Sequence, residues 1–193
     1  MRVTGGAHRG RRLQTTTARD LRPTTDLARR SIFDSLGDRV RGARVLDLFA
    51  GAGTLGIEAL SRGASTVVFV ERDARARDLI RRNLDALAMV ETARIVRRDA
   101  ESYLRGRAHA PFDLVFLDPP YGAGLGFVTL VLQRIADGGW VASGGTVVVE
   151  ASVGEIQWPA SFRETRIRRF GQTQVTVAEQ DAGTTDGNLP RDV

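Results

Sequence analysis

The chain has 193 residues, of which 42% are hydrophobic and 26% are charged. This balance is typical of one folded domain and argues against a disordered chain. No apolar run approaches the roughly 20 residues that span a bilayer, and no apolar segment follows the N-terminal arginines as in a secretory signal. The chain has no cysteine and only two histidines, His8 and His109, which lie far apart. We therefore expect a cytoplasmic protein without disulfides, without a metal site and without a membrane partner.

Charge is distributed unevenly along the chain. All 28 basic residues are arginine, and the net charge is +5. Residues 1–30 hold eight arginines against Asp20 and Asp26, a net charge of +6, so the remainder carries −1. A basic segment on a nearly neutral body favours a polyanionic partner such as nucleic acid, and a merely solvated basic terminus is the alternative.

The predicted elements begin with a short polar and basic segment, residues 1–17, which is typical of a hairpin or arm. A helix is expected over 22–38, because its apolar residues follow helical spacing after a proline. Strands and helices then alternate. The expected strands cover 43–50, 65–71, 93–99, 112–118 and 145–152, and the expected helices cover 53–63, 73–88, 100–106 and 126–140.

This alternation predicts an α/β fold, a doubly wound Rossmann-like parallel sheet with helices on both faces. Two further strand-like runs, 162–171 and 172–180, have no helix between them and predict an antiparallel hairpin at the sheet edge. From residue 181 onward almost no residue is apolar, which is typical of a disordered tail. The expected division is a basic arm over 1–20, a catalytic domain over 21–180 and a tail over 181–193.

A glycine-rich turn follows the first expected strand. Residues 47–56, DLFAGAGTLG, carry the spacing G-x-G-x-x-G at Gly51, Gly53 and Gly56, and Glu71 ends the next strand. Such glycines permit a tight turn and close approach of a nucleotide, while the acid accepts both ribose hydroxyls. Taken alone, the pattern suits a nicotinamide dehydrogenase as well as other nucleotide-binding enzymes.

Asp47 favours a different cofactor. In the dinucleotide fingerprint a pyrophosphate reaches the helix N-terminus, and a carboxylate ahead of Gly51 would repel it. The same carboxylate suits a ligand with adenosine at one end and an ammonium and a sulfonium at the other, which describes S-adenosylmethionine. The alternative for Asp47 is helix capping or loop bonding. Asp99, after the third strand, is expected to accept a bond from the adenine amine, to cap the next helix, or both.

The fourth strand ends in Asp118, Pro119, Pro120 and Tyr121. Prolines cannot donate to a sheet ladder, so the strand stops there, beside the first strand and in the crevice where such sheets bind ligands. The Asp118 carboxylate and the Pro119 carbonyl could each accept one N–H bond from an exocyclic base amine, which would localise the nitrogen lone pair. Tyr121 would then stack on a flipped base.

These motifs resemble a known family. The set DLFAGAGTLG, VE and LDPPY is similar to class I S-adenosylmethionine-dependent N-methyltransferases. The segments GGAHRGRRL, LRPTTDLARRSIFDSL and LDLFAGAGTLGIEALSRGA narrow the resemblance to the bacterial RsmD family, over about residues 2–180. The resemblance implies a seven-stranded sheet and methylation of the N2 amine of one guanine, guanine 966, in 16S ribosomal RNA. It implies small-subunit RNA, the 30S subunit or an assembly intermediate as partner, and we expect a monomer.

The resemblance also implies the site residues. Catalysis is assigned to Asp118, Pro119, Pro120 and Tyr121. The cofactor is expected at Thr24, Thr25, Asp47, Phe49, Ala50, Gly51, Gly53, Glu71, Arg72, Asp99 and Ala100, with Thr24 and Thr25 closing over its methionine end. Ribosomal RNA is expected at Arg2, His8, Arg9, Arg11, Arg12 and Arg22. Phosphate contacts position a substrate without reading its sequence, so the choice of guanine rests on the resemblance alone.

Three other functions remain open at this point. An adenine-N6 methyltransferase of RNA or DNA would use the same cofactor and the same tetrapeptide, although the chain has no separate domain to read a DNA sequence. An NAD-dependent oxidoreductase would use the glycine turn but leaves the Asp118 segment unexplained. A basic RNA-binding assembly factor would leave the catalytic site unused, and the intact Asp118 argues against it.

Overall fold

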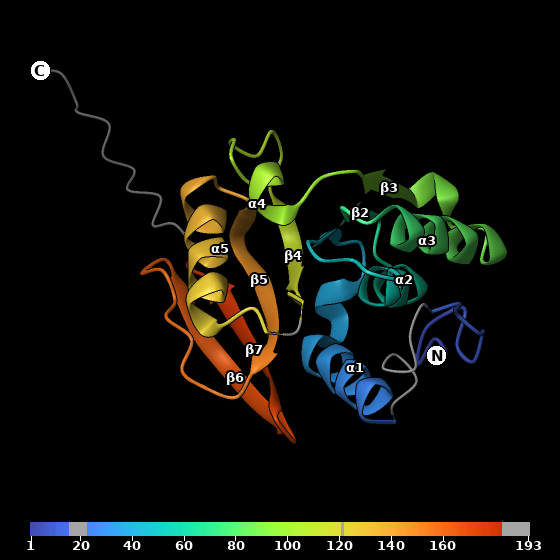
Figure 1. Ribbon diagram of the computed structural model, residues 1–193, viewed down its shortest axis with the longest axis horizontal. Helices are drawn as coiled ribbons and strands as arrows, with labels where there is room; N and C mark the ends of the chain where they lie inside the picture. The colour runs from blue at the N-terminus through green and yellow to red at the C-terminus, as the bar shows by residue number, and fades with distance from the viewer. Residues whose placement is uncertain (16–22, 121, 183–193) are drawn as a thin grey trace, which may run out of the picture.

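The computed structural model describes residues 1–15, 23–120 and 122–182. Its centre is a seven-stranded sheet with the order β3-β2-β1-β4-β5-β7-β6 (Figure 1). The strands are β1 (Arg44–Asp47), β2 (Thr66–Val70), β3 (Ala93–Val96), β4 (Phe112–Leu117), β5 (Val141–Ser152), β6 (Phe162–Phe170) and β7 (Thr173–Gln180). Strands β1 to β5 pair in parallel, and β7 pairs antiparallel with both β5 and β6. The doubly wound sheet with a C-terminal hairpin is thus confirmed.

Helices cover both faces of the sheet. They are α1 (Pro23–Leu36), α2 (Thr54–Ser61), α3 (Ala74–Ala86), α4 (Ala100–Tyr103) and α5 (Leu125–Asp137), with 3-10 turns η2 (Gly37–Val40) and η3 (Val90–Thr92). One buried cluster joins α1, α2 and α3 to the sheet, and a second joins α4 and α5 to the other face. No helix in the described ranges is long and apolar enough to cross a membrane.

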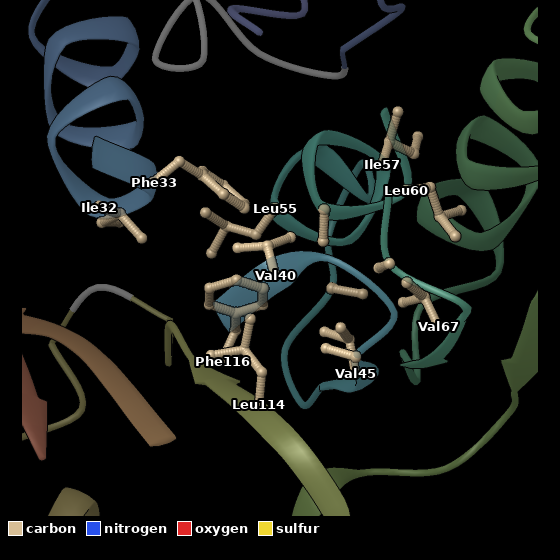
Figure 2. Close-up of a cluster of buried hydrophobic side chains, with 14 of the residues drawn as sticks. Ile32, Phe33, Val40, Val45, Leu55, Ile57, Leu60, Val67, Leu114 and Phe116 are labelled. Atoms are coloured by element: carbon tan, nitrogen blue, oxygen red, sulfur yellow. The ribbon is translucent and has the colours of Figure 1, made fainter. Parts of the chain in front are cut away.

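The larger cluster fixes α1 and α2 over the middle strands (Figure 2). Phe33 of α1 packs on Phe116 of β4 with ring centroids 5.6 Å apart, and both side chains are fully buried. Burying one such side chain contributes roughly 1.5–3 kcal/mol. The loops that follow β1 and β4 therefore start from rigidly packed strands.

Strand β5 begins at Val141, four residues before the expected start at residue 145. The glycine pair Gly144 and Gly145 lies inside the strand, where a sequence pattern suggests a break. Gly144 has a φ of 73°, and a Cβ on Gly145 would lie 2.8 Å from the Ala142 carbonyl oxygen. The register against β4 shifts there, so the pair makes an irregularity within the strand and does not end it.

The N-terminal hairpin, residues 1–15, packs onto the domain (Figure 1). Arg2 and Arg12 form an antiparallel bridge, and the Val3 N–H donates to the Arg11 carbonyl at 3.0 Å. Val3 and Leu13 are buried in the cluster that holds α1 and α2. The hairpin thus shares a core with the residues that follow. The expected boundary at residue 20 lies outside the described residues, as does nearly all of the expected tail, and both stay predictions.

A buried carboxylate fastens this hairpin. Glu58 of α2 is fully buried, and it accepts from the Thr4 backbone N–H at 2.8 Å and the Thr4 hydroxyl at 2.7 Å. It also forms ion pairs with Arg62 at 2.8 Å and with buried Arg29 of α1 at 3.4 Å. Arg29 in turn donates to the Arg2 carbonyl at 2.6 Å. The hairpin, α1 and α2 therefore share one buried charge cluster.

Candidate active site

A cavity of about 690 Å³ lies at the carboxyl ends of the parallel strands. Ligands of open α/β sheets bind at this edge, where the strand order reverses. Its walls come from the residues that follow β1, β2, β3 and β4, together with the start of α5. The lining residues are Leu48, Phe49, Gly51, Val70, Glu71, Arg72, Asp73, Arg98, Asp99, Ala100, Glu101, Asp118, Pro120, Ala123 and Phe127.

The cavity is acidic although the chain is basic. Five lining residues are acids and two are arginines, so their formal net charge is −3 against +5 for the whole chain. Glu101 is partly offset by Arg134, whose nearest nitrogen lies 3.5 Å from its carboxylate. An acidic cavity attracts a cation and repels a pyrophosphate.

The glycine turn and Glu71 meet at the cavity wall. Gly51 adopts a φ of 54°, and its N–H donates to Glu71 Oε2 at 2.9 Å. The Asp73 N–H donates to Glu71 Oε1 at 2.7 Å. A carboxylate has about four acceptor positions, so Glu71 retains two for a ligand. A Cβ on Gly56 would lie 2.3 Å from the Phe69 ring, so this glycine serves the packing of α2 on β2.

Asp47 lies beneath this turn and is not among the lining residues. Its side chain is buried, and Oδ2 accepts from the Gly56 N–H in the first turn of α2 at 3.0 Å. Oδ1 is buried without a hydrogen-bond partner in the part of the chain that is described. Burial raises the pKa of Asp47 to about 7; the Gly56 hydrogen bond opposes this rise and the nearby Glu71 charge adds to it. The carboxylate therefore occupies the helix end that a pyrophosphate would need.

Asp99 serves as a helix cap and as a cavity residue at once. Its side chain accepts from the Ser102 N–H at 2.8 Å at the start of α4, and this bond is the main cause that lowers the pKa of Asp99. Asp99 and the next residue, Ala100, both line the cavity. The two roles expected from the sequence are therefore compatible.

The Asp118 segment reaches the same cavity. Asp118 and Pro120 line it, Pro119 is half-buried outside the lining set, and Tyr121 lies outside the described residues. Strand β4, which ends at Leu117, pairs in parallel with β1 as expected. The catalytic candidate Asp118 and the cofactor candidates Glu71 and Asp99 thus share one cavity.

The other expected cofactor residues are placed differently. Phe49 and Arg72 line the cavity, and Phe49 meets Phe127 of α5 edge-on, with ring centroids 6.0 Å apart. Ala50 and Gly53 do not line it; Ala50 is buried, and Gly53 starts α2 in a left-handed conformation. Thr24 and Thr25 lie in the first turn of α1, and their side chains are outside the described part of the chain.

The expected RNA contacts lie on the hairpin, away from the cavity lining. Arg9 and Arg12 are exposed, and the Arg11 guanidinium donates to the Ala86 carbonyl of α3 at 3.2 Å. Arg2 donates to the Gly10 carbonyl at 2.7 Å, and the His8 backbone N–H donates to Ser61 of α2 at 3.0 Å. Arg22 lies outside the described residues. The described ranges contain no cluster of three or more acids and histidines placed to hold a metal ion.

Several lining residues escaped the sequence reasoning. Asp73 follows Glu71 by two positions and caps α3, so an N-cap search beside the predicted ribose acid would have found it. Phe127 and Ala123 belong to the turn and helix after Asp118, and no local motif marks them. Arg98 precedes Asp99 and reads as an ordinary exposed charge. Such residues come together only when the strand ends are placed side by side.

Comparisons with known proteins agree on one family. The family described as conserved hypothetical protein 95 matches residues 1–179. The ribosomal RNA small subunit methyltransferase D of Escherichia coli is 36% identical over 94% of this chain and 91% of its own. The protein of that name from Haemophilus influenzae is 34% identical over 78% of each chain. A solved structure of Escherichia coli yhhF matches with a TM-score of 0.85 and 35% identity, over 94% of this chain and 98% of that one. The chain therefore belongs to the conserved hypothetical protein 95 family, that is, the RsmD family, and has its Rossmann-like methyltransferase fold.

Proposed function

We propose that the protein transfers a methyl group from S-adenosylmethionine to the exocyclic N2 amine of a guanine in small-subunit ribosomal RNA. The observation that carries the proposal is the shared cavity, in which Asp118 lies with Glu71 and Asp99. The relatives named ribosomal RNA small subunit methyltransferase D support the substrate class. By resemblance the target is guanine 966, on the assembling subunit, which would make the protein cytoplasmic.

The residues around the cavity fit S-adenosylmethionine better than a dinucleotide. The lining has a formal charge of −3, and Asp47 already holds the N-terminal turn of α2 through the Gly56 N–H. Asp47 Oδ1 is a buried acceptor without a partner in the described ranges, which suits an ammonium group held directly or through water. Glu71 would accept the ribose hydroxyls, and Asp99 would accept the adenine amine. An NAD-dependent reaction is disfavoured because its pyrophosphate would meet these acids.

The chain's own groups prepare the base amine for reaction. S-adenosylmethionine supplies a methyl group on a sulfonium, a neutral leaving group. The Asp118 carboxylate and the Pro119 carbonyl would accept the two N–H bonds of the amine and so localise the nitrogen lone pair. As the amine nitrogen takes the methyl group, the C–S electron pair would stay on sulfur, and the Asp118 carboxylate would accept the proton that the amine loses. Preorganised acceptors of this kind act on charge that develops in the transition state.

The hairpin provides the surface for the RNA backbone. Arg9 and Arg12 are exposed on a segment that is fastened to α2 through Glu58 and to α3 through Arg11. Arginine contacts to phosphates position the substrate and leave the choice of base to the cavity. We infer that the hairpin holds the RNA while the target base turns into the cavity.

One experiment tests the whole proposal. The protein is incubated with labelled S-adenosylmethionine and small ribosomal subunits that lack modifications, and the methylated nucleoside is mapped by mass spectrometry. N2-methylguanine at a single position is the expected product. N6-methyladenine would instead support the adenine alternative, and an unlabelled subunit together with NADH binding would support the oxidoreductase.

A further inference from the structure

An acid follows a run of three valines near the carboxyl end of the interior strand β5. Glu150 follows Val147, Val148 and Val149 in β5 and is half-buried. Its strand is flanked on both sides, because β5 pairs with β4 and β7, and Glu150 itself lies opposite Val175. A carboxylate placed in this way loses hydration, so its presence calls for a partner. The reaction described above does not use it.

The register places this acid beside the catalytic segment. Leu117 of β4 is the partner of Val149, so the next residues along the two strands are Asp118 and Glu150. Neighbouring strands lie about 4.8 Å apart, which brings the two acidic positions to adjacent places at the carboxyl edge of the sheet. Val149 packs in the α5 cluster and Val148 in the α1 cluster, so alternation turns Glu150 toward α1.

Arg29 of α1, whose charge acts on this acid, already has partners. Burial raises the pKa of Glu150, and the positive charge of Arg29 opposes that rise. The Arg29 guanidinium is engaged by Asp26 at 2.8 Å, by the Arg2 carbonyl at 2.6 Å and by Glu58 at 3.4 Å. No hydrogen bond to the Glu150 side chain occurs among the residues that the structure describes. As far as the described residues go, the carboxylate thus lies near a cation and has acceptor positions that no other group occupies.

We propose that Glu150 selects guanine by accepting the N1–H of the base whose N2 amine is bound at Asp118. The inference rests on the proposed function and concerns the same site. Guanine presents N1–H and N2–H donors side by side on its Watson–Crick edge, and two adjacent carboxylates complement that pair. Adenine presents an unprotonated N1 there, which a carboxylate repels. A site built around a substrate hydrogen bond rejects analogues that lack it by large factors, up to about 10⁴–10⁵.

The test compares two bases with one preparation of enzyme. Small subunits are reassembled with RNA that carries either guanine or 2-aminopurine at the mapped nucleotide. 2-Aminopurine keeps the N2 amine but has no N1–H. The wild-type protein is expected to methylate guanine at least a hundred-fold faster. In Glu150→Gln the side-chain amide can donate to N1 of 2-aminopurine, and the preference for guanine is expected to fall by ten-fold or more.

The ratio of rates cancels any loss of folded protein, so it reports selectivity alone. Glu155→Gln, at an exposed acid five residues further along, is the matched control and should keep the wild-type ratio. An unchanged ratio in Glu150→Gln would overturn the inference even where the wild-type product is N2-methylguanine. If the wild-type product is not N2-methylguanine, the proposed function itself fails and the role of Glu150 fails with it.

Discussion

The cavity at the strand ends and the N-terminal hairpin are opposite in charge. The cavity lining carries a formal charge of −3, whereas the hairpin carries Arg2, Arg9, Arg11 and Arg12 and no acidic residue. The net charge of the chain, +5, conceals this separation. The proposed cationic cofactor and anionic RNA would therefore each meet a surface of opposite charge.

The two regions also differ in how they are built. The cavity is made by loops that leave packed parallel strands, whereas the hairpin is tied to α2 by hydrogen bonds to Glu58 and Ser61. Helix α2 thus starts at the glycine turn beside the cavity and holds the hairpin along its C-terminal half. This helix therefore connects the two regions physically.

Asp118 should give the largest effect of any residue tested, if this acid in the cavity acts on the substrate amine. Asp118→Ala should lower turnover on unmodified subunits by about a hundred-fold or more, because one charged acceptor is lost in the transition state. S-adenosylmethionine affinity, measured by calorimetry, should stay near that of the wild type. Asp113→Ala is the control, since this exposed acid lies at the opposite end of β4 and accepts from the Arg44 N–H. Turnover within three-fold of wild type in Asp118→Ala would remove the residue from the reaction.

A change at Glu71 should weaken cofactor binding without weakening RNA binding. Glu71→Ala removes the acceptor for the ribose hydroxyls, and a hydrogen bond to a charged group contributes about 1.5–3 kcal/mol. We expect S-adenosylmethionine affinity to fall by roughly ten- to a hundred-fold, with RNA binding unchanged. The S-adenosylmethionine affinity of Glu71→Gln should lie between those of the wild type and Glu71→Ala, because the amide oxygen still accepts a hydrogen bond. The exposed Glu91→Ala serves as control, and equal affinities in all variants would contradict a role of Glu71 at the ribose.

Asp47 should make stability depend on pH in a specific direction. Its folded pKa is about 7 against an ordinary value of 3.8, so the folded state holds a proton that the unfolded state has lost. Stability from this group is full below pH 3.8 and falls by up to about 1.4 kcal/mol per pH unit as the pH rises toward 7. Asp47→Asn should remove this slope in urea unfolding between pH 4 and pH 7. The control Asp85→Asn, at an exposed site on α3, should retain the slope. If stability plotted against pH runs parallel for the wild type and Asp47→Asn, the raised pKa of Asp47 is contradicted.

The sequence predicted the sheet because each strand is an apolar run between segments with helical periodicity. This signal is local, so it can be recognised in a short stretch of sequence. It also predicted that the glycine turn and Glu71 follow the first two strands, and these strands lie side by side with the Gly51 N–H donating to Glu71. It did not predict that Asp47 would be buried beneath the turn and outside the cavity lining, because burial depends on how tightly α2 packs on β2. The early start of β5 was missed because glycines usually mark a break.

The buried Glu58 and the half-buried Glu150 were missed for a different reason. Each reads as one charged residue in an ordinary helix or strand. Besides the local Arg62, the partners of Glu58 come from residue 4, which is 54 positions earlier, and from α1. The neighbour of Glu150 comes from the register of β4. Information of this kind lies in long-range pairing, which no local pattern contains.

Removing charge from the hairpin should give the smallest effect. It also distinguishes an RNA-binding hairpin from a merely solvated terminus. Deleting it would unseat Val3 and Leu13 from the core and leave Glu58 without Thr4, so charge removal is the sharper experiment. Arg9→Gln with Arg12→Gln leaves these contacts intact. Each lost phosphate contact should flatten the slope of log affinity against log salt by about 0.7–0.9, so the pair should flatten it by at most about 1.8. Binding near physiological salt should weaken by only several-fold.

The control pair for this experiment is Arg41→Gln with Arg107→Gln. Both arginines are exposed, and both precede parallel strands, β1 and β4, at the end of the sheet opposite the cavity. The slope, measured with unmodified subunit RNA, should be unchanged in the control pair. The affinity for S-adenosylmethionine should be unchanged in both pairs. If the hairpin pair and the control pair flatten the slope equally, positive charge acts wherever it lies on the surface. If only the hairpin pair flattens it, the RNA backbone lies along the hairpin while the acidic cavity is left to the cofactor and the target base.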